Sequence, residues 1–509
     1  MKITILTAGT RGDVQPFIAL GLELKKLGSE VTVVSSVTFE NLVKSYGLEY
    51  RMTRGDISKI MQSGELDKAA NADNPIKALS ILRDKKFMSR LIDVQEDFYN
   101  ACDDAEVIIY HPGAAIGHMI AKEKGIVSIL GSPFPLIETN EYPSILFYQK
   151  RIPKILNRLT HKFFKQGFWM ATKKPIELFY KDRLSKLVLL ENSLKSKDLK
   201  LISCSQNIFK TPQPAFASGY WFLDESDGYI PEASLTEFLS KGDKPIYIGF
   251  GSIGNGQFAE EKTKIIISAI QKTNSRAVIA TGFGGLSEIT DLPENIYILK
   301  EAPHAWLFPK MSMAIHHGGA GTTAEGFRAG IPMIIVPHGN DQFAWGKRVF
   351  ELGVGANPIN IKKLSVEKLV NAIEYARSKN ITENVKQLSR IIQNENGAKK
   401  TAKFVMDYIN IRQQRKTKIG AFKETKFIFN EFKNLILIKL SIPIILGIII
   451  GGVYLGLQIL KGLTFDAALN NLLNLERMIR PFAGFLIIIV FLVFGFNIFR
   501  KLKNYRENS

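Results

Sequence analysis

Cysteine is almost absent from this chain, since Cys102 and Cys204 are the only two among 509 residues. Two cysteines cannot build the framework of disulfide bonds that holds small secreted domains together, so that class of protein is excluded. The pair instead indicates a reducing compartment, or thiols with a simple packing role.

No long apolar run opens the chain, because Arg11 and Asp13 interrupt the first hydrophobic residues. We therefore expect no signal peptide and a cytoplasmic location for the bulk of the protein. An Asp-x-Asp motif in a context suited to metal binding is also missing. Asp103-Asp104 precedes the apolar segment 107–110, where we expect it to cap or solvate the junction, so the sequence predicts no metal site and no cofactor.

Acidic residues are few relative to basic ones, with 48 Asp and Glu against 67 Lys and Arg, for a net charge of +19. Residues 411–509 alone carry 15 basic and 5 acidic residues, which is +10 of that total. No nucleic-acid-binding motif accompanies the basic excess. We therefore expect no nucleic acid partner and instead the anionic cytoplasmic leaflet of a membrane.

Two stretches near the C-terminus contain no charged residue: 440–460, with 21 residues, and 481–499, with 19. At a rise of about 1.5 Å per residue, either helix would cross a hydrocarbon core of about 30 Å, which predicts a two-helix transmembrane anchor over 440–509. Eight Lys or Arg lie in the juxtamembrane segment 411–439 and four in 500–509, against three in the loop 461–480. Positive flanks stay in the cytoplasm, so we expect a two-pass membrane protein with both termini and the preceding domains cytoplasmic.

Apolar segments alternate with helical ones over the first 400 or so residues, a pattern typical of doubly wound α/β units. We expect one domain over 1–212 and a second over 213–410, with a linker around the proline-rich and polar stretches 211–214 and 224–228. The expected strands cover 3–7, 31–34, 107–110, 126–130 and 201–203 in the first domain, and then 245–252, 277–280, 296–299 and 313–315 in the second.

The stretch 316–325, His-His-Gly-Gly-Ala-Gly-Thr-Thr-Ala-Glu, has the composition of a diphosphate cradle. It follows an expected strand and leads into an expected helix over 323–329, which is where open α/β sheets bind ligands. Its three glycines let the backbone approach phosphate oxygens, and the helix N-terminus attracts an anion. The alternative is a glycine-rich turn with a satisfied histidine. The residues that would contact the diphosphate are His317, Gly318, Gly319, Gly321, Thr322 and Thr323.

Three further side chains are placed to hold the rest of a nucleotide sugar. Glu325, in the first turn of the expected helix, offers its carboxylate to two ribose hydroxyls. Asp341 and Gln342, in the segment Pro-His-Gly-Asn-Asp-Gln, offer acceptors and donors to vicinal hydroxyls of a hexose.

The first residues of the chain predict a βα unit. A strand over 3–7 is followed by a polar glycine loop and by a helix that Pro16 opens and Gly28 ends. Asp13 in that loop is placed to cap the helix. His111, at the end of the strand 107–110, is compatible with a position facing the cleft, but a histidine at such a turn is more often structural, and we expect that role.

Residues 316–355 resemble the nucleotide-sugar signature of the family 1 UDP-glycosyltransferases, especially the branch of the sterol and lipid glucosyltransferases and the glycopeptide-antibiotic glucosyltransferases. Residues 1–17, with the motif Arg-Gly-Asp-Val-x-Pro, resemble the first strand and loop of the family 28-like N-terminal domain of that branch. The likeness covers residues 1–410. It implies the GT-B fold, an α/β architecture in which two Rossmann-like domains face each other across a cleft.

The resemblance also implies roles for single residues. Asp13 matches the general base of this branch, where plant relatives carry histidine. Three further donor-binding positions of the family are matched by Gly12, Ser252 and His304. The Gly-Ser pair that contains Ser252 is also compatible with an ordinary turn, and the segment that ends at His304 begins with Glu301 where plant members have a stacking tryptophan.

The implied reaction is the metal-independent, inverting transfer of a hexose, with glucose favoured, from a UDP-sugar to a hydroxyl. Asp13 would take the proton of that hydroxyl late, in an oxocarbenium-like transition state, because a carboxylate with a pKa of about 4 is a weak base. A membrane anchor indicates a lipophilic acceptor: a sterol, terpenoid, carotenoid or glycerolipid. The alternatives are a transferase for a soluble aglycone and a GT-B nucleotide-sugar epimerase or binding protein.

The acceptor region is expected over 134–200, where aromatic residues are interleaved with basic ones. The pattern predicts an amphipathic surface that meets anionic lipid. The alternative is a set of ordinary helices with core aromatics and a solvated basic face. The aromatic residues concerned are Phe134, Tyr142, Phe147, Tyr148, Phe163, Phe164, Phe168 and Trp169.

Overall fold

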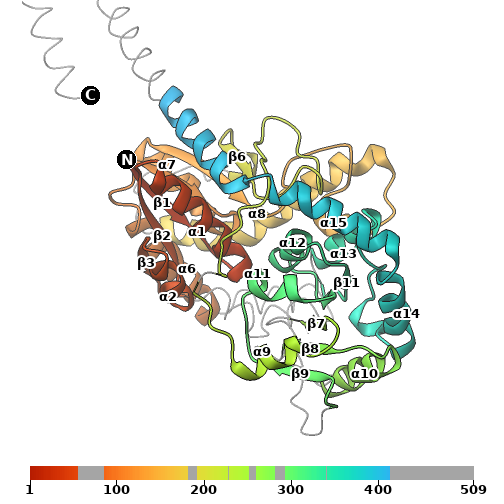
Figure 1. Ribbon diagram of the computed structural model, residues 1–509. Helices are drawn as coiled ribbons and strands as arrows, with labels where there is room; N and C mark the ends of the chain where they lie inside the picture. The colour runs from red at the N-terminus through yellow and green to blue at the C-terminus, as the bar shows by residue number, and fades with distance from the viewer. Residues whose placement is uncertain are drawn as a thin grey trace, which may run out of the picture. The chain divides into compact units, whose positions relative to one another are not determined.

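The computed structural model describes residues 1–55, 85–181, 192–226, 228–250, 259–280, 293–339 and 341–412 (Figure 1). The chain divides into two compact units, Met1–Asp407 and Tyr408–Ser509. Of the second unit, the description covers only 408–412. The first unit therefore carries the whole account of the fold and of the site.

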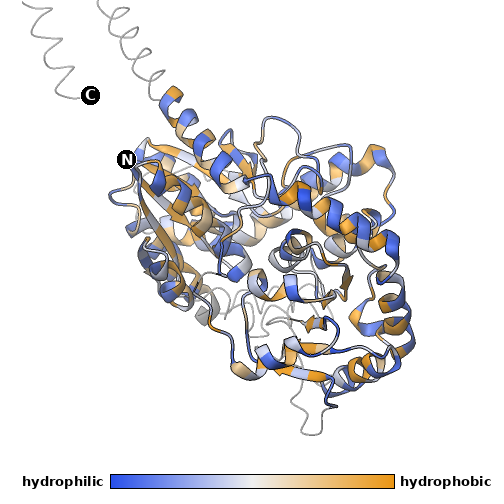
Figure 2. Ribbon diagram, in the orientation of Figure 1, coloured by the Kyte–Doolittle hydropathy of each residue, from blue (hydrophilic) through white to orange (hydrophobic). Residues whose placement is uncertain are grey.

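The first part of this unit is built on a sheet of six parallel strands in the order β3-β2-β1-β4-β5-β6. Its two central strands, β1 and β4, are hydrophobic along most of their length (Figure 2), as expected for strands of a parallel sheet covered on both faces. The strands are β1 (Lys2–Leu6), β2 (Glu30–Ser36), β3 (Glu49–Thr53), β4 (Val107–Tyr110), β5 (Val127–Ser132) and β6 (Leu199–Ile202).

A second parallel sheet of five strands follows, in the order β11-β10-β7-β8-β9. Between the two sheets, residues 203–232 contain no helix or strand in their described part. The strands are β7 (Ile246–Gly249), β8 (Ala277–Ala280), β9 (Ile296–Leu299), β10 (Met313–His316) and β11 (Met333–Ile335). The two parallel sheets confirm the expected α/β class, and every expected strand is present.

Helices connect successive strands, as parallel sheets require. Those of the first sheet are α1 (Arg11–Lys26), α2 (Glu40–Ser45), α6 (Lys85–Asn100), α7 (Ile116–Lys124) and α8 (Asn157–Lys181). Those of the second are α9 (Ala233–Ser240), α10 (Ala259–Lys272), α11 (His304–Leu307), α12 (Ala320–Ala329), α13 (Gln342–Glu351), α14 (Val366–Ala376) and α15 (Lys379–Gln393). A further helical segment covers 397–412.

One hydrophobic core runs from the first sheet into the helices of the second. It joins side chains of β1 and β4 to Phe327 of α12 and Trp345 of α13, all fully buried. Phe209, which follows β6, meets Trp345 edge-on with ring centroids 5.4 Å apart. The last helical segment closes the unit, since Phe404 stacks on Phe216 at 3.9 Å. This packing fixes the loops of one sheet against those of the other.

The prediction that Pro16 opens the first helix is wrong. Helix α1 begins five residues earlier, at Arg11, with Thr10 at the N-cap position and Pro16 inside the helix. The earlier start is stabilised by Asp13, whose Oδ2 accepts the Thr10 backbone N–H at 2.7 Å. Proline is tolerated there because its φ is helical, at the loss of the hydrogen bond that residue 16 would otherwise donate to the Gly12 carbonyl.

No helix among the described residues has both the length and the apolar character to cross a membrane. The expected spans 440–460 and 481–499 lie outside the described residues, as does all of the juxtamembrane segment 411–439 except residues 411 and 412. The transmembrane hairpin therefore stays a prediction.

Candidate active site

The N-termini of α1 and α12 meet at two glycines. A Cβ added to Gly321 would lie 3.6 Å from the Cα of Gly12, which is van der Waals contact, so the two backbones are close neighbours here. Each helix starts at the carboxyl end of a strand, α1 after β1 and α12 after β10. Because unpaired N–H groups and the positive ends of both helix dipoles converge here, this junction is suited to an anion.

Asp13 lies at this junction, in the first turn of α1. Its Oδ2 accepts hydrogen bonds from the backbone N–H of Thr10 at 2.7 Å and from the Thr10 hydroxyl at 3.0 Å. Its Oδ1 lies 3.4 Å from Nε2 of His111. Burial raises the pKa of Asp13, but His111 and Thr10 outweigh it and hold that pKa below its usual value. The side chain is therefore a carboxylate at neutral pH.

His111 is the neighbour of Asp13 to which the sequence interpretation gave little weight. Its Nδ1 accepts the backbone N–H of Gly113 at 3.1 Å, and its Nε2 lies 3.4 Å from Oδ1 of Asp13. The signal was available: His111 follows β4 as Asp13 follows β1, and β1 and β4 pair directly in the sheet. The expectation that a histidine at such a turn is structural did not use this pairing.

His317 lies over the N-terminus of α12. A Cβ added to Gly319, the N-cap residue, would come within 2.6 Å of Nε2 of His317, so glycine makes room for the ring. Burial, with a further contribution from His338, lowers the pKa of His317 to about 4 against a bond to the Gly249 backbone. The ring is neutral at pH 7 and can offer an N–H donor to phosphate, but no positive charge.

His304 is also neutral at this site. Its pKa is lowered to about 4 by burial and then by the nearby positive charge of Arg11. Nε2 of His304 lies 3.1 Å from the hydroxyl of Tyr247, and its ring stacks on Phe308 at 4.5 Å. The effect of Arg11 on His304 shows that the Arg-Gly-Asp segment and the segment 301–304, which matches a donor-binding position of the family, lie near each other.

The two threonines of the cradle differ in their surroundings. Thr323 is fully buried, and its hydroxyl donates to the carbonyl of Gly319 at 2.9 Å, which satisfies its own helix. Thr322 is half-buried. Because α12 starts at Ala320 rather than at residue 323, Gly321 and Thr322 belong to its first turn, where free N–H groups lie.

The same early start moves Glu325 out of the first turn, so that part of the sequence interpretation is wrong. Glu325 is buried and paired with Arg328, its Oε2 lying 2.8 Å from the guanidinium. Burial nonetheless raises the pKa of Glu325 to about 7. Arg328 itself lies over the ring of Phe222 at 4.6 Å, so this pair also secures α12 to the segment between the sheets.

Asp341 and Gln342 stand at the start of α13. The pKa of Asp341 is raised to about 6 by burial and by the charge of Asp13, although Trp345 donates to its Oδ2 at 2.9 Å. Asp341 and Asp13 therefore share one electrostatic environment, although they belong to different sheets. Gln342 is buried and its Oε1 accepts the backbone N–H of His338 at 2.7 Å, so its carbonyl end shapes the loop.

Two other expectations can be compared with the structure only in part. Ser252 lies outside the described residues. Asp103 and Asp104 form surface ion pairs, Asp104 with Arg51 at 2.7 Å and Asp103 with Lys124 at 3.3 Å. Among the described residues, no group of three or more His, Cys, Asp or Glu is placed to hold a metal ion.

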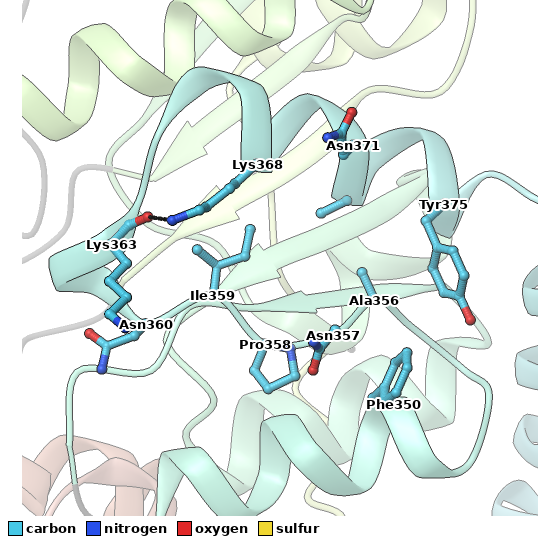
Figure 3. A pocket seen from close by; sticks show the side chains of 11 residues that line it. Phe350, Ala356, Asn357, Pro358, Ile359, Asn360, Lys363, Lys368, Asn371 and Tyr375 are labelled. Carbon is cyan, nitrogen blue, oxygen red and sulfur yellow. Dashed lines mark hydrogen bonds between the residues drawn. The ribbon is translucent and has the colours of Figure 1, made fainter.

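A pocket of about 480 Å³ lies away from these residues, between α13, α14 and the chain that joins them (Figure 3). None of the expected donor-binding residues lines it. Lys368 donates to the Lys363 carbonyl there at 3.0 Å, and Phe350 and Tyr375 form its other side. The candidate active site is therefore defined by converging helix termini and carboxylates, and this pocket lies apart from it.

Two protein-family models match the two parts of the chain that contribute to this site. Residues 3–93 match the glycosyltransferase family 28 N-terminal domain. Residues 264–405 match the C-terminal domain of the erythromycin biosynthesis protein CIII-like family. The first match contains Gly12 and Asp13, and the second contains the diphosphate cradle.

The chain is 31% identical over 415 residues to a sterol 3-beta-glucosyltransferase of Arabidopsis thaliana, covering 78% of this chain and 66% of the relative. It is 31% identical to a sterol 3-beta-glucosyltransferase of Pichia angusta, over 84% of this chain but only 35% of that longer protein. The glycotransferase of kitacinnamycin superposes with a TM-score of 0.59 at 18% identity, covering 79% of this chain and 98% of that one. The chain thus spans two thirds or less of the length of these curated relatives.

The two parallel sheets, the converging helix termini and these likenesses define a glycosyltransferase of the GT-B fold. Within that class, the chain belongs to the glycosyltransferases that combine a family 28 N-terminal domain with an erythromycin CIII-like C-terminal domain.

Proposed function

We propose that this protein transfers glucose from UDP-glucose to the hydroxyl of a membrane lipid, with a sterol as the favoured acceptor. The observation that carries the proposal is the placement of the Asp13 carboxylate where α1 meets the N-terminus of α12. A base and an anion site lie next to each other, which is what transfer from a sugar diphosphate requires. The similarity to sterol 3-beta-glucosyltransferases supports the choice of acceptor.

In the proposed reaction, the acceptor oxygen attacks the anomeric carbon as the bond from that carbon to the diphosphate breaks. The acceptor proton passes to Asp13, and the electron pair of the broken bond stays on the departing diphosphate. Because donors to Asp13 depress its pKa, the carboxylate takes the proton late, when the attacking oxygen has become strongly acidic. Attack from the face opposite the leaving group inverts the anomeric configuration.

The leaving group would be stabilised by the first turn of α12 and by His317. Backbone N–H groups at a helix N-terminus provide fixed dipoles without reorganisation during the reaction. His317 contributes a neutral donor, since burial keeps its pKa at about 4. This arrangement supports transfer without a divalent metal or any other cofactor.

The donor sugar would lie between the two carboxylates at the junction. Asp341, whose pKa responds to the charge of Asp13, would contact sugar hydroxyls while Asp13 faces the acceptor. Glu325, secured by Arg328, would accept hydrogen bonds from the ribose. Galactose and N-acetylglucosamine are the competing donor sugars.

The acceptor and the location follow from the expected anchor. A hairpin over 440–509 with positive flanks would hold the active site at the cytoplasmic face of a membrane, where a sterol hydroxyl is exposed. A soluble aglycone, in contrast, needs no anchor.

The test is transfer of radiolabel from UDP-glucose into total lipid extract by the full chain in detergent with EDTA present. Wild type should label the organic phase, while Asp13→Asn should lose transfer by about 10² to 10⁴ fold, the usual contribution of a general base. The matched control is Asp103→Asn, which changes an exposed aspartate in a surface ion pair and should keep full activity.

Three outcomes would count against the proposal. Transfer that disappears with EDTA would overturn the metal-free reaction, and full activity in Asp13→Asn would remove Asp13 as the base. If no label reaches lipid with UDP-glucose, UDP-galactose or UDP-N-acetylglucosamine, the acceptor is not a lipid. Label in a water-soluble glycoside would then identify a soluble aglycone, and labelled nucleotide sugar of altered configuration an epimerase.

A further inference from the structure

Residues 142–176 contain no acidic side chain. They carry eight Lys or Arg and no Asp or Glu, a local excess found over the segment that leads into α8 and along most of that helix. A basic stretch on its own is usually a solvated face. What makes this one unusual is the apolar surface that accompanies it.

Large hydrophobic side chains are exposed along this segment. Ile155, in the short 3-10 helix Lys154–Leu156 that leads directly into α8, is 86% exposed, and on α8 itself Leu159 is 45% exposed, Phe163 62% and Met170 69%. On α8, residues 159 and 163 are four positions apart and 170 follows two turns later, so they form a stripe along that helix, which Ile155 precedes in the 3-10 turn. Single exposed hydrophobic residues are ordinary, but an aligned set of this size marks an interaction surface.

A stripe of cations runs beside the apolar one. Lys154, Arg158 and Lys162 each precede a stripe residue by one position and are exposed. Arg158 forms an ion pair with Glu138 at 3.4 Å. Lys165 of the same helix is buried, and its ammonium group lies 3.2 Å from the same carboxylate. Long basic side chains beside an apolar stripe allow their stems to lie on the apolar surface while their charges reach outward.

Most of the aromatic residues of this region belong to the hydrophobic core and not to the exposed stripe. Tyr148 and Trp169 are buried in the core that joins the two sheets, and Phe134, Tyr142, Phe164 and Phe168 pack against it. The expectation of core aromatics is therefore correct for them. The exposed stripe consists instead of aliphatic residues with the single aromatic Phe163.

We propose that the exposed stripe of Ile155, Leu159, Phe163 and Met170, with its flanking Lys154, Arg158 and Lys162, docks on an anionic lipid bilayer. A helix with an apolar face and a basic border lies in the membrane plane, with its apolar side chains about 5–10 Å into the headgroup region. The basic border pairs with lipid phosphates and acidic headgroups. The docked helix would hold the first sheet against the membrane through a contact separate from the C-terminal segment.

The positive charge beside the stripe favours an anionic bilayer over a second copy of this chain as the surface that covers it. A twofold interface would place these basic stripes against each other with no acidic residue in 142–176 to compensate. An anionic lipid surface removes that repulsion. The contact does not depend on transferase activity, so it stands or falls separately from the proposed reaction.

The buried native thiols make a site-specific probe practical. Cys102 and Cys204 are both fully buried, so a cysteine introduced at the surface is the one that reacts with an environment-sensitive fluorophore. We would label Ile155→Cys and Phe163→Cys in the full chain. Ile230→Cys is the matched control, because Ile230 is 88% exposed and lies outside the stripe.

The labelled proteins are reconstituted into vesicles of phosphatidylcholine alone, or with about 30% phosphatidylglycerol, that contain a quencher on the lipid tails. We expect quenching by more than about half at 155 and 163 in anionic vesicles, and little at 230. Salt at about 1 M, where the Debye length is about 3 Å, should weaken it. Lys154→Glu with Lys162→Glu should abolish the dependence on anionic lipid, whereas Lys362→Glu with Lys363→Glu should not.

Equal quenching at 155, 163 and 230 would overturn the proposal, whether that quenching is strong or absent. A fluorescence change at 155 that needs no lipid and grows with protein concentration would overturn it too, in favour of a second copy. A full-chain variant with a disrupted active site, Asp13→Asn, should show the same quenching as its parent, which separates docking from catalysis.

Discussion

Nε2 of His111 lies 3.4 Å from Oδ1 of Asp13, and the two residues stand at the ends of neighbouring parallel strands. The backbone N–H of Gly113 donates to Nδ1 of the imidazole, so Nε2 is the ring nitrogen that faces the carboxylate. His111 thus lies against the proposed base and lowers its pKa. A carboxylate held this way is ready to receive a proton at neutral pH without itself needing to be activated.

Replacing His111 by alanine should move the acid limb of the kcat/KM profile to higher pH. Asp13 works in its ionised form, so activity is present above its pKa and is lost as the pH falls through it. His111 lowers that pKa, and without it burial raises the pKa of Asp13. We expect kcat to fall about tenfold as well, because the base is less well oriented. Rates measured from pH 4 to 8 provide the check.

His118→Ala is the control for this experiment. His118 also pairs with an aspartate of the same domain, its Nδ1 lying 2.7 Å from Oδ2 of Asp198. That variant should lose stability and leave the acid limb in place. If the limb does not move in His111→Ala either, His111 serves packing alone.

Gly319→Ala should raise the KM for the nucleotide sugar by about tenfold with little effect on thermal stability. The new Cβ would be 2.6 Å from Nε2 of His317 and must push that ring off the N-terminus of α12. A factor of ten corresponds to one neutral hydrogen bond of about 1.4 kcal/mol. Gly167→Ala, where nothing lies within 4 Å of the added Cβ, is the control and should leave the KM unchanged.

Asp341→Asn should stabilise the protein at neutral pH and weaken donor binding. The pKa of Asp341 rises from 3.8 to about 6 on folding, mainly through burial, so the folded state binds its proton more tightly than the unfolded chain. Stability from this group is fully present below pH 3.8 and is lost as the pH rises to about 6. The ionised side chain then costs up to about 3 kcal/mol.

The measurement is thermal unfolding of both proteins at pH 5 and pH 8. The advantage of Asp341→Asn over wild type should be larger at pH 8 than at pH 5, since asparagine does not titrate and its side-chain oxygen can still accept the Trp345 donor. An equal difference at pH 5 and pH 8 would mean that burial does not raise the pKa of Asp341. Activity should fall in the same variant, because a group kept at a cost in stability usually serves function.

The expected hairpin makes a topological prediction. A cysteine placed at Asn470 should react with a membrane-impermeant maleimide in intact cells, whereas one at Ser509 should react only after permeabilisation. The buried native thiols keep the background low. The opposite pattern, or labelling of both sites in intact cells, would refute cytoplasmic termini.

Short-range patterns were sufficient for most of the fold. The segments 107–110, 277–280 and 296–299 are strands with those bounds in the structure, because a strand buried on both faces is a continuous apolar run. The cradle was recognisable for a similar reason, since its glycines and threonines are adjacent in the chain. The start of α1 was misplaced because Pro16 was interpreted as the first helical residue, whereas the Thr10 and Asp13 pair caps the helix earlier.

The amino-acid sequence by itself thus determined the α/β class, most of the strands and the cradle, all of which depend on residues within a few positions of one another, while Asp13 as the candidate base came from the resemblance to a known family. Only the tertiary structure decided that His111 faces Asp13, that Gly12 meets Gly321, and that Thr323 and Gln342 turn toward the backbone. These contacts depend on strand order and on how the two sheets pack. No periodicity along the chain encodes them, because residues distant in sequence become neighbours only once a shared core forms.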